Sequence, residues 1–136
     1  MLQFVHHVHY LVKNRDAMVD YLEKNFGMKP DLLEVNHNGI EARYNLDQTQ
    51  IQFTEPTDPN SSMGRQLAKH GPGVFHVAWG VNNIRKVAQE LSAKGNKMRA
   101  RGKDGKELVS ENQEGILICN LDPASSQGVW FQLAEG

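Results

Sequence analysis

The sequence contains one short segment twice, and this internal repeat limits the folds that the chain can adopt. Residues 5–12 (VHHVHYLV) resemble residues 74–81 (VFHVAWGV), and aligning the two segments places His7 on His76. The two histidines lie 69 positions apart, which is about half of the 136 residues. A repeat of this length indicates two copies of one supersecondary unit.

Each half of the sequence shows the pattern of a strand, a helix and further strands. Apolar residues alternate in the strands and recur every three or four positions in the helices, and Gly27 and Gly95 end the two helices. The expected elements are strands at 4–12, 32–35, 40–46, 50–54, 74–81, 97–100, 108–110, 116–121 and 128–134, with helices at 17–26, 63–70 and 84–94. We therefore expect an α+β fold in a single domain of residues 1–136, with module one at 1–55, a linker and short helix at 56–73, and module two at 74–136.

The overall composition excludes several classes of partner. The formal net charge is −1, so no charge excess favours nucleic acid or an acidic membrane surface. No apolar run approaches the ~20 residues that span a bilayer. The single cysteine, Cys119, excludes an internal disulfide, and the N-terminus lacks a signal-peptide pattern. We expect a cytoplasmic protein.

Alternation assigns two faces to the strands. The apolar positions, such as Val8 and Tyr10, are expected to lie under the helices, and the opposite faces carry four coordinating side chains, two in each module. These residues are His7, Gln52, His76 and Gln132. Imidazole nitrogen and amide oxygen can both bind a divalent cation. A role as hydrogen-bonded structural residues remains the alternative.

Four motifs resemble the vicinal oxygen chelate superfamily, and most of all its methylmalonyl-CoA epimerases. They are residues 5–8 (VHHV), 49–52 (TQIQ), 73–77 (GVFHV) and 122–133 (DPASSQGVWFQL). The resemblance implies two βαβββ modules related by a pseudo-twofold, which form an open eight-stranded cup around a divalent metal such as Co, Ni, Zn, Mn or Fe. It also implies that the four coordinating side chains are the metal ligands, and that the protein is a homodimer.

The chain departs from this family at two positions that matter for proton transfer. The epimerases usually carry glutamate at the position of Gln132. They have a second glutamate two residues before a glycine, where this chain has His37 before Gly39. The four proposed ligands are all neutral, and glutamine cannot move a proton at neutral pH. His37 can act as a general base, although an exposed turn residue is the alternative.

A carboxylate at the site would favour the two-histidine, one-carboxylate chemistry of non-haem iron oxygenases. Shifting the last strand of either module by one residue would bring Glu55 or Glu135 to the ligand face. The same shift would turn Phe53 and Leu133 away from the helices. We therefore expect both glutamates on the helix side, which makes dioxygenase chemistry the less favoured function.

Other residues suggest contacts with a substrate. His9 shares the face of His7, and Trp130 shares the face of Gln132, so both are predicted to line the substrate pocket; for Trp130, burial at a subunit contact is an equal alternative. A basic run forms either a solvated hairpin or a binding surface for anionic groups such as the phosphates of coenzyme A. This run comprises Lys94, Lys97, Arg99, Arg101, Lys103 and Lys106.

The predicted function is that of a metal-dependent enzyme, an isomerase or lyase similar to methylmalonyl-CoA epimerase, that stabilises the enolate of a carboxylated acyl thioester. His37 is the predicted catalytic residue, and the expected partner is a small molecule, an acyl-CoA among the options. Two alternatives use the same scaffold. One is a non-catalytic protein that binds or sequesters a small molecule, and the other is a lyase similar to glyoxalase I, which the missing terminal glutamate disfavours.

Overall fold

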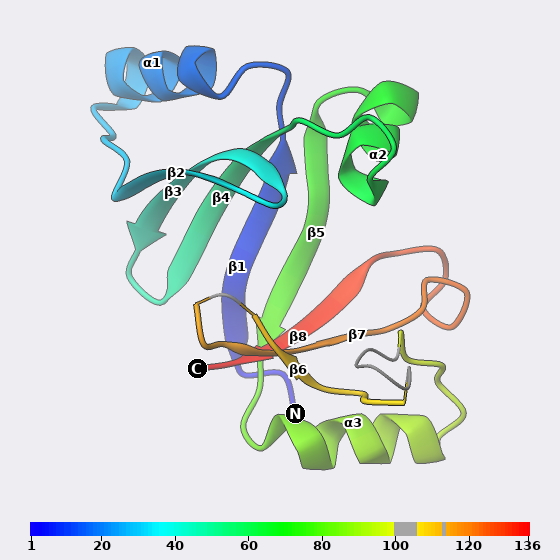
Figure 1. Cartoon of the computed structure of the whole chain (residues 1–136). Coiled ribbons are helices and arrows are strands. Elements are labelled where there is room, and N and C mark those ends of the chain that lie inside the picture. The colour runs from blue at the N-terminus through cyan, green and yellow to red at the C-terminus, as the bar shows by residue number, and fades with distance from the viewer. Residues whose placement is uncertain (100–105, 113) are drawn as a thin grey trace. The chain divides into compact units, whose positions relative to one another are not determined.

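The computed structural model describes residues 1–99, 106–112 and 114–136. Its internal contacts divide the chain into two compact units. The first unit is His7–Phe75, and the second unit combines Met1–His6 with His76–Gly136. Each unit contains both helix and strand (Figure 1), which confirms the predicted α+β fold class with two modules. The N-terminal six residues belong to the second unit, a division that the sequence repeat does not predict.

The first unit is a four-stranded sheet with a helix packed on one face. Its elements are β1 (Phe4–Leu11, from His7), α1 (Arg15–Phe26), β2 (Leu32–Asn36), β3 (Gly39–Leu46), β4 (Thr49–Pro56) and α2 (Ser62–His70). The strands follow the order β2-β3-β4-β1, with β1 parallel to β4 and the other neighbours antiparallel. Val12, Ala42, Tyr44 and Phe53 form the core beneath α1, together with apolar side chains of the helix.

The second unit repeats this arrangement. Its elements are β5 (Gly73–Gly80, from His76), α3 (Ile84–Ala93), β6 (Ser110–Glu111), β7 (Leu117–Asn120) and β8 (Phe131–Glu135). The strand order is β5-β8-β7-β6, and β5 runs parallel to β8. The larger apolar core lies between α3 and the strands and includes Ile84, Cys119 and Leu133.

Near the end of the last strand of each unit lies a glutamate that accepts hydrogen bonds from the start of the helix in the same unit. The backbone N–H of Arg15 donates to Glu55 Oε1 at 2.9 Å. In the second unit the N–H groups of Asn83 and Ile84 donate to Glu135 at 2.6 and 3.0 Å. A carboxylate here satisfies N–H groups that lack helical partners and complements the helix dipole. Both glutamates therefore lie on the helix side, as the alternation predicts.

One predicted strand is wrong. Residues 97–100 were expected to form a strand, but the described part of this segment contributes only an isolated bridge between Met98 and Leu121, and Ala100 lies outside the described residues. The backbone N–H of Lys97 donates to the Ser125 hydroxyl rather than to a neighbouring strand, which prevents a regular ladder. Among the helices that the structure describes, none is both long and apolar enough to cross a membrane.

Candidate functional site

The structure places one predicted histidine–glutamine pair in each unit, and the two pairs have the same strand register. In the first unit His9 is the partner of Gln52 across the parallel strands, so His7 lies two residues before that position. In the second unit Ala78 is the partner of Gln132, and His76 again lies two residues earlier. Because strand side chains alternate, the histidine and glutamine of each pair share one face.

Both glutamine amides are held by a neighbouring amide oxygen. Gln52 Nε2 donates to Gln50 Oε1 at 2.8 Å, and Gln132 Nε2 donates to Asn120 Oδ1 at 3.0 Å. Both glutamines are buried. Since the NH₂ group of each side chain is used as a donor, the carbonyl oxygen, which is the atom that can bind a cation, turns the other way. This orientation suits an amide ligand.

The predicted ligands differ in burial. His7 is buried, whereas His76 is half-buried. Within the described residues, no three histidine, cysteine, aspartate or glutamate side chains gather in a way that could hold a metal ion. The predicted set contains two amides and is not of that type, so its role as a metal site remains a prediction.

His9 lies in a buried hydrogen-bond chain rather than at an open surface. The residue is 3% exposed, its Nε2 lies 2.7 Å from Thr54 Oγ1, and its ring makes a T-shaped contact with the ring of Phe75. Thr54 gives its only hydroxyl proton to Glu41, so His9 must be the donor to Thr54, which fixes the tautomer with hydrogen on Nε2. Burial, and the nearby His7 and Arg43, lower the pKa of His9 to about 3.

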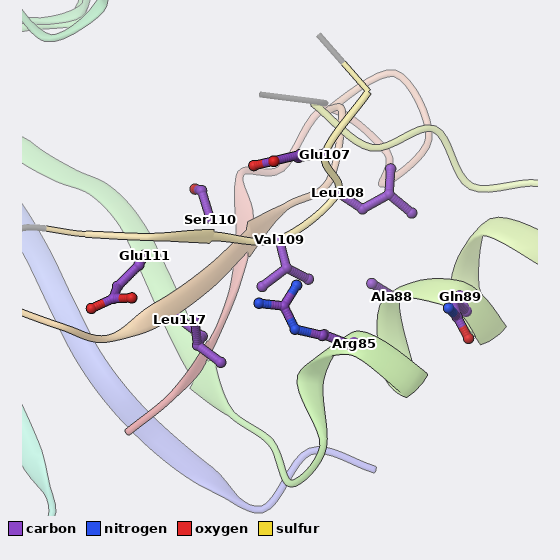
Figure 2. A pocket seen from close by; sticks show the side chains of 9 residues that line it. All are labelled: Arg85, Ala88, Gln89, Glu107, Leu108, Val109, Ser110, Glu111 and Leu117. Carbon is purple, nitrogen blue, oxygen red and sulfur yellow. The ribbon is translucent and has the colours of Figure 1, made fainter. Parts of the chain in front are cut away.

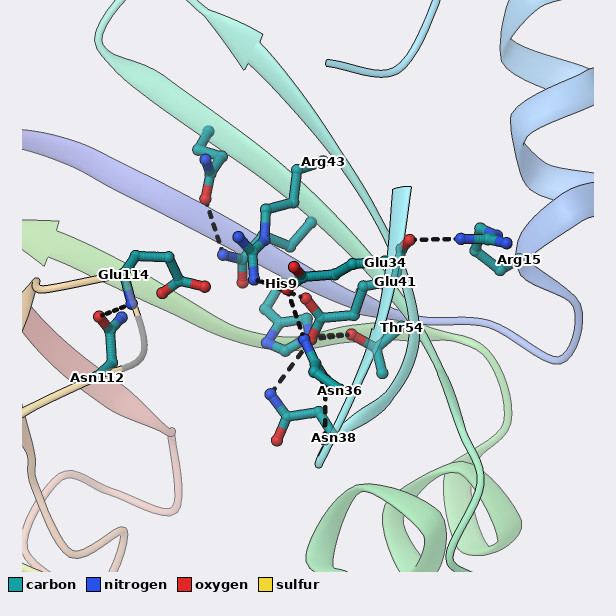
Figure 3. A network of polar contacts seen from close by, with 12 residues as sticks. His9, Arg15, Glu34, Asn36, Asn38, Glu41, Arg43, Thr54, Asn112 and Glu114 are labelled. Atoms are coloured by element: carbon teal, nitrogen blue, oxygen red, sulfur yellow. Dashed lines mark hydrogen bonds and ion pairs between the residues drawn. The ribbon is translucent and has the colours of Figure 1, made fainter. Parts of the chain in front are cut away.

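The sequence pattern did not reveal the carboxylate of Glu41, which lies at the centre of this buried hydrogen-bond network. Glu41 and Arg43 are 1% and 5% exposed, on the same face of β3 as the polar side chains of β4. Arg43 Nη2 lies 3.0 Å from Glu41 Oε2 and 2.8 Å from Glu34 Oε1. Figure 3 shows these groups pointing toward one another and toward His9. The signal available in the sequence was the alternation of charged residues with Ile40, Ala42 and Tyr44 along this strand.

His37 is exposed at the tip of the turn between β2 and β3. The residues on either side of it are held. Asn36 Oδ1 accepts from the backbone N–H of Asn38 at 2.9 Å, and Asn38 Nδ2 donates to Glu41 Oε1 at 3.2 Å. The turn that carries the predicted base is therefore joined directly to the buried network.

Trp130 is half-buried just before β8, and the guanidinium of Arg99 lies 4.1 Å from the centre of its ring. This cation–π contact joins the basic run to a residue that was predicted to line the substrate pocket. Two members of the run, Arg101 and Lys103, lie outside the described residues.

A pocket in the second unit lies on the opposite face of the sheet from Gln132. Its walls come from α3 and from residues 107–111 and Leu117 (Figure 2). Val109 and Ala88 belong to the core under α3. Leu117 lies on the face of β7 opposite to that of Asn120, which is the strand partner of Gln132. None of the predicted site residues lines it.

Comparisons with known proteins agree with the fold. The sequence model of the glyoxalase/bleomycin resistance protein/dioxygenase superfamily matches residues 6–110. No curated protein matches the chain. Among solved structures, a methylmalonyl-CoA epimerase in complex with methylmalonyl-CoA and NH₄⁺ is 26% identical, with a TM-score of 0.83 over 100% of this chain and 96% of that one.

Two further epimerase structures are similar. A variant of the Streptomyces coelicolor methylmalonyl-CoA epimerase in complex with 2-nitronate-propionyl-CoA is 26% identical, with a TM-score of 0.83 over 100% of this chain and 96% of that chain. The enzyme from Mycobacterium tuberculosis is 22% identical, with a TM-score of 0.83 over 98% of this chain and 88% of that one. The second likeness concerns the fold alone.

Proposed function

Because the chain belongs to the glyoxalase/bleomycin resistance protein/dioxygenase superfamily, we propose that it is a divalent-metal-dependent enzyme acting on a carboxylated acyl-CoA. Its reaction would be an isomerisation, a lyase step or hydrogen exchange at the carbon next to the thioester carbonyl. The epimerase complexes with acyl-CoA ligands support this substrate class.

One observation carries the proposal: the histidine–glutamine pair recurs with the same register in both units. A structural hydrogen-bonding role would not require the same two residue types at the same two positions of a diverged repeat. We propose that His7, Gln52, His76 and Gln132 are ligands of a divalent ion, as the family resemblance implies.

The donor set fits a first-row divalent cation. Imidazole nitrogens suit Zn, Ni, Co and Fe, and the NH₂ group of each amide is engaged as a donor, so its oxygen is turned away from that partner. A divalent ion at this site would stabilise negative charge that develops on an enolate oxygen. With no carboxylate among the ligands, we expect weaker metal affinity than in a site with a glutamate ligand.

His37 is the proposed base. In the proposed step its ring nitrogen takes the proton from the carbon next to the thioester carbonyl, and the electron pair of the broken C–H bond stays on the substrate as the enolate. Returning a proton to the same carbon completes the exchange. Histidine is the side chain that most often serves as a general acid or base in enzymes.

The test combines metal binding with isotope exchange. Purified protein is titrated with Co²⁺, Ni²⁺, Zn²⁺ and Mn²⁺ by calorimetry, and deuterium uptake from D₂O into methylmalonyl-CoA is followed by mass spectrometry. We expect one bound metal per chain and metal-dependent uptake that His37→Ala abolishes. Failure to bind any of these metals would refute the proposal.

A second function is favoured by Gln132, which stands where the epimerases usually have glutamate. A protein without this carboxylate could bind an acyl-CoA or another small molecule without turning it over. Tight metal-free ligand binding with no deuterium uptake would select this function. We also propose a homodimer, which light scattering of the purified protein would test.

A further inference from the structure

The two units orient equivalent glutamine amides by different neighbouring residues. In the first unit the acceptor for Gln52 Nε2 is the side-chain oxygen of Gln50, two residues earlier on the same strand, at 2.8 Å. In the second unit the acceptor for Gln132 Nε2 is the side-chain oxygen of Asn120, the residue directly opposite on β7, at 3.0 Å. The donor atom and the kind of acceptor are the same, although the acceptor comes from a different strand position in each unit.

The strand registers show that neither acceptor is repeated between the units. Arg43 takes the place of Asn120 in the first unit, since both are the antiparallel strand partner of the glutamine. Trp130 takes the place of Gln50 in the second unit, since both lie two residues before the glutamine. Arginine has no acceptor atom, and the indole of tryptophan is a donor only. Each unit therefore supplies an amide oxygen at the one position of the two where the other unit lacks it.

This pattern indicates that the orientation of the amides, and not a particular pair of residues, is what the two units share. A glutamine can bind a cation only through its oxygen, because its NH₂ group is a donor. We propose that Gln50 and Asn120 are positioning residues that hold the amides of Gln52 and Gln132 so that the oxygen, rather than the NH₂ group, serves as the metal ligand. This inference rests on the proposed function, in which both glutamines are ligands.

The acceptor of the first unit is itself oriented. Gln50 Nε2 donates to Asn45 Oδ1 at 3.3 Å, and Asn45 is the strand partner of Gln50 on β3. With its NH₂ group used in this way, Gln50 offers its oxygen to Gln52. The amide of Gln52 is thus the last member of a row of three amides that all donate in one direction.

In the second unit Asn120 and Gln132 form a pair across β7 and β8. Two amides in contact can pair in two ways, because the NH₂ group of either one can donate to the oxygen of the other. Only the observed pairing leaves the oxygen of Gln132 turned away from Asn120. Asn120→Asp leaves acceptors alone at this position and so permits only the observed pairing, whereas Asn120→Leu, of similar size, permits neither.

Calorimetric titration of the whole chain with Co²⁺ tests the proposal. We expect Asn120→Leu to weaken Co²⁺ binding about 10–100-fold, as loss of a residue that orients a metal ligand typically does. Asn120→Asp should bind Co²⁺ at least as tightly as the wild type. Asn96→Leu is the matched control with an affinity within about 2-fold of the wild type, because Asn96 belongs to the same unit but donates to the last turn of α3. Equal affinity for Asn120→Leu and the wild type would overturn the inference.

A double-mutant cycle with Gln132→Glu separates positioning from any effect of Asn120 on the fold. A carboxylate has an oxygen at both ends, so it needs no neighbour to turn an oxygen toward the ion. In the Gln132→Glu background we therefore expect Asn120→Leu to change the Co²⁺ affinity less than about 3-fold, which makes the two changes non-additive. The same fold-loss in both backgrounds would overturn the inference.

The first unit provides an independent test. Gln50 is half-buried, so variants at this position test the same reasoning even where Asn120→Leu does not fold. Gln50→Leu should weaken Co²⁺ binding about 10-fold or more, and Gln50→Glu, which keeps the acceptor, should retain the wild-type affinity. Equal losses in both variants would show that packing alone matters here and would overturn the role of Gln50.

A measurement on the metal-free protein does not depend on the proposed function. A side-chain NH₂ hydrogen of Gln132 is donated to Asn120. In the protein labelled with nitrogen-15, NMR should show this hydrogen exchanging with solvent about 10-fold faster in Asn120→Leu than in the wild type, and no faster in Asn96→Leu. Unchanged exchange in Asn120→Leu would overturn the inference. A wild type that shows the expected exchange but binds none of Co²⁺, Ni²⁺, Zn²⁺ and Mn²⁺ would refute the proposed function instead.

Discussion

Removing the carboxylate that caps α3 gives a stability prediction with a clear magnitude. Glu135 accepts from the N–H groups of Asn83 and Ile84 at 2.6 and 3.0 Å, and Asn83, with φ 54°, makes no side-chain cap of its own. Glu135→Ala therefore leaves this helix start without a side-chain partner. Loss of a cap costs about 0.5–2 kcal/mol and loss of the charge at the helix dipole about 0.3–1 kcal/mol, so we expect about 1–3 kcal/mol in total.

The same change in the first unit provides the comparison. Glu55 accepts a single helix N–H, from Arg15, and Asn14 Oδ1 separately accepts from the N–H of Ala17. We therefore expect Glu55→Ala to cost about half as much as Glu135→Ala, at about 0.5–1.5 kcal/mol.

Urea unfolding followed by circular dichroism measures both losses. With a slope of about 2 kcal/mol per M, the Glu135→Ala midpoint should fall by about 0.5–1.5 M. Calorimetric titration with Co²⁺ should give the wild-type affinity, because Glu135 lies on the helix side of β8. Equal losses at Glu55 and Glu135 would refute the capping argument, and a large loss of metal affinity would show that Glu135 is a ligand.

Three further predictions follow from individual side chains. Burial lowers the pKa of His9 to about 3, so between pH 6.5 and 3 the unfolded chain binds a proton that the folded chain does not. The free energy of unfolding should therefore fall by up to about 1.4 kcal/mol per pH unit over this range. Urea midpoints measure this fall, and an equal fall in His9→Gln would contradict the prediction. Burial raises the pKa of Cys119 to about 11, so a thiol reagent at pH 8 should label it only as fast as the protein unfolds, and rapid labelling of the folded protein would contradict this. Gln132→Glu should tighten Co²⁺ binding about 10-fold or more by adding a negative ligand, as measured by calorimetry, and unchanged affinity would count against Gln132 as a ligand.

The repeat accounts for what the sequence predicted well. Two aligned histidines and the two-residue period of the strands predicted that His7 and Gln52 share a face, and the observed register agrees. The same period predicted that Glu55 and Glu135 lie on the helix side, where both contact a helix start. These features depend on local alternation, which a sequence displays directly.

The buried network could not be predicted in the same way. Charged residues that alternate with apolar ones usually mark a strand with one solvated face, so the pattern of β3 alone does not indicate that Glu41 is buried. Its burial depends on Arg43, Thr54 and His9, which are brought together by pairing between distant segments. A further signal was the apolar residue Ile118 at the equivalent position of the second unit, where it pairs with Ala134 as Glu41 pairs with Thr54.

The capping glutamates also bear on how each module forms. Arg15 and Glu55 are 40 positions apart, and Ile84 and Glu135 are 51 apart. In each unit the first strand is likewise paired in parallel with the last. A nascent chain that has completed a helix thus still lacks the residue that anchors its first turn, and such non-local closure slows folding. The first turn of each helix is capped only when the last strand of the same module has paired. A fragment that ends before Glu55 or Glu135 should therefore have a frayed helix, and each module should form its structure in one late, cooperative step.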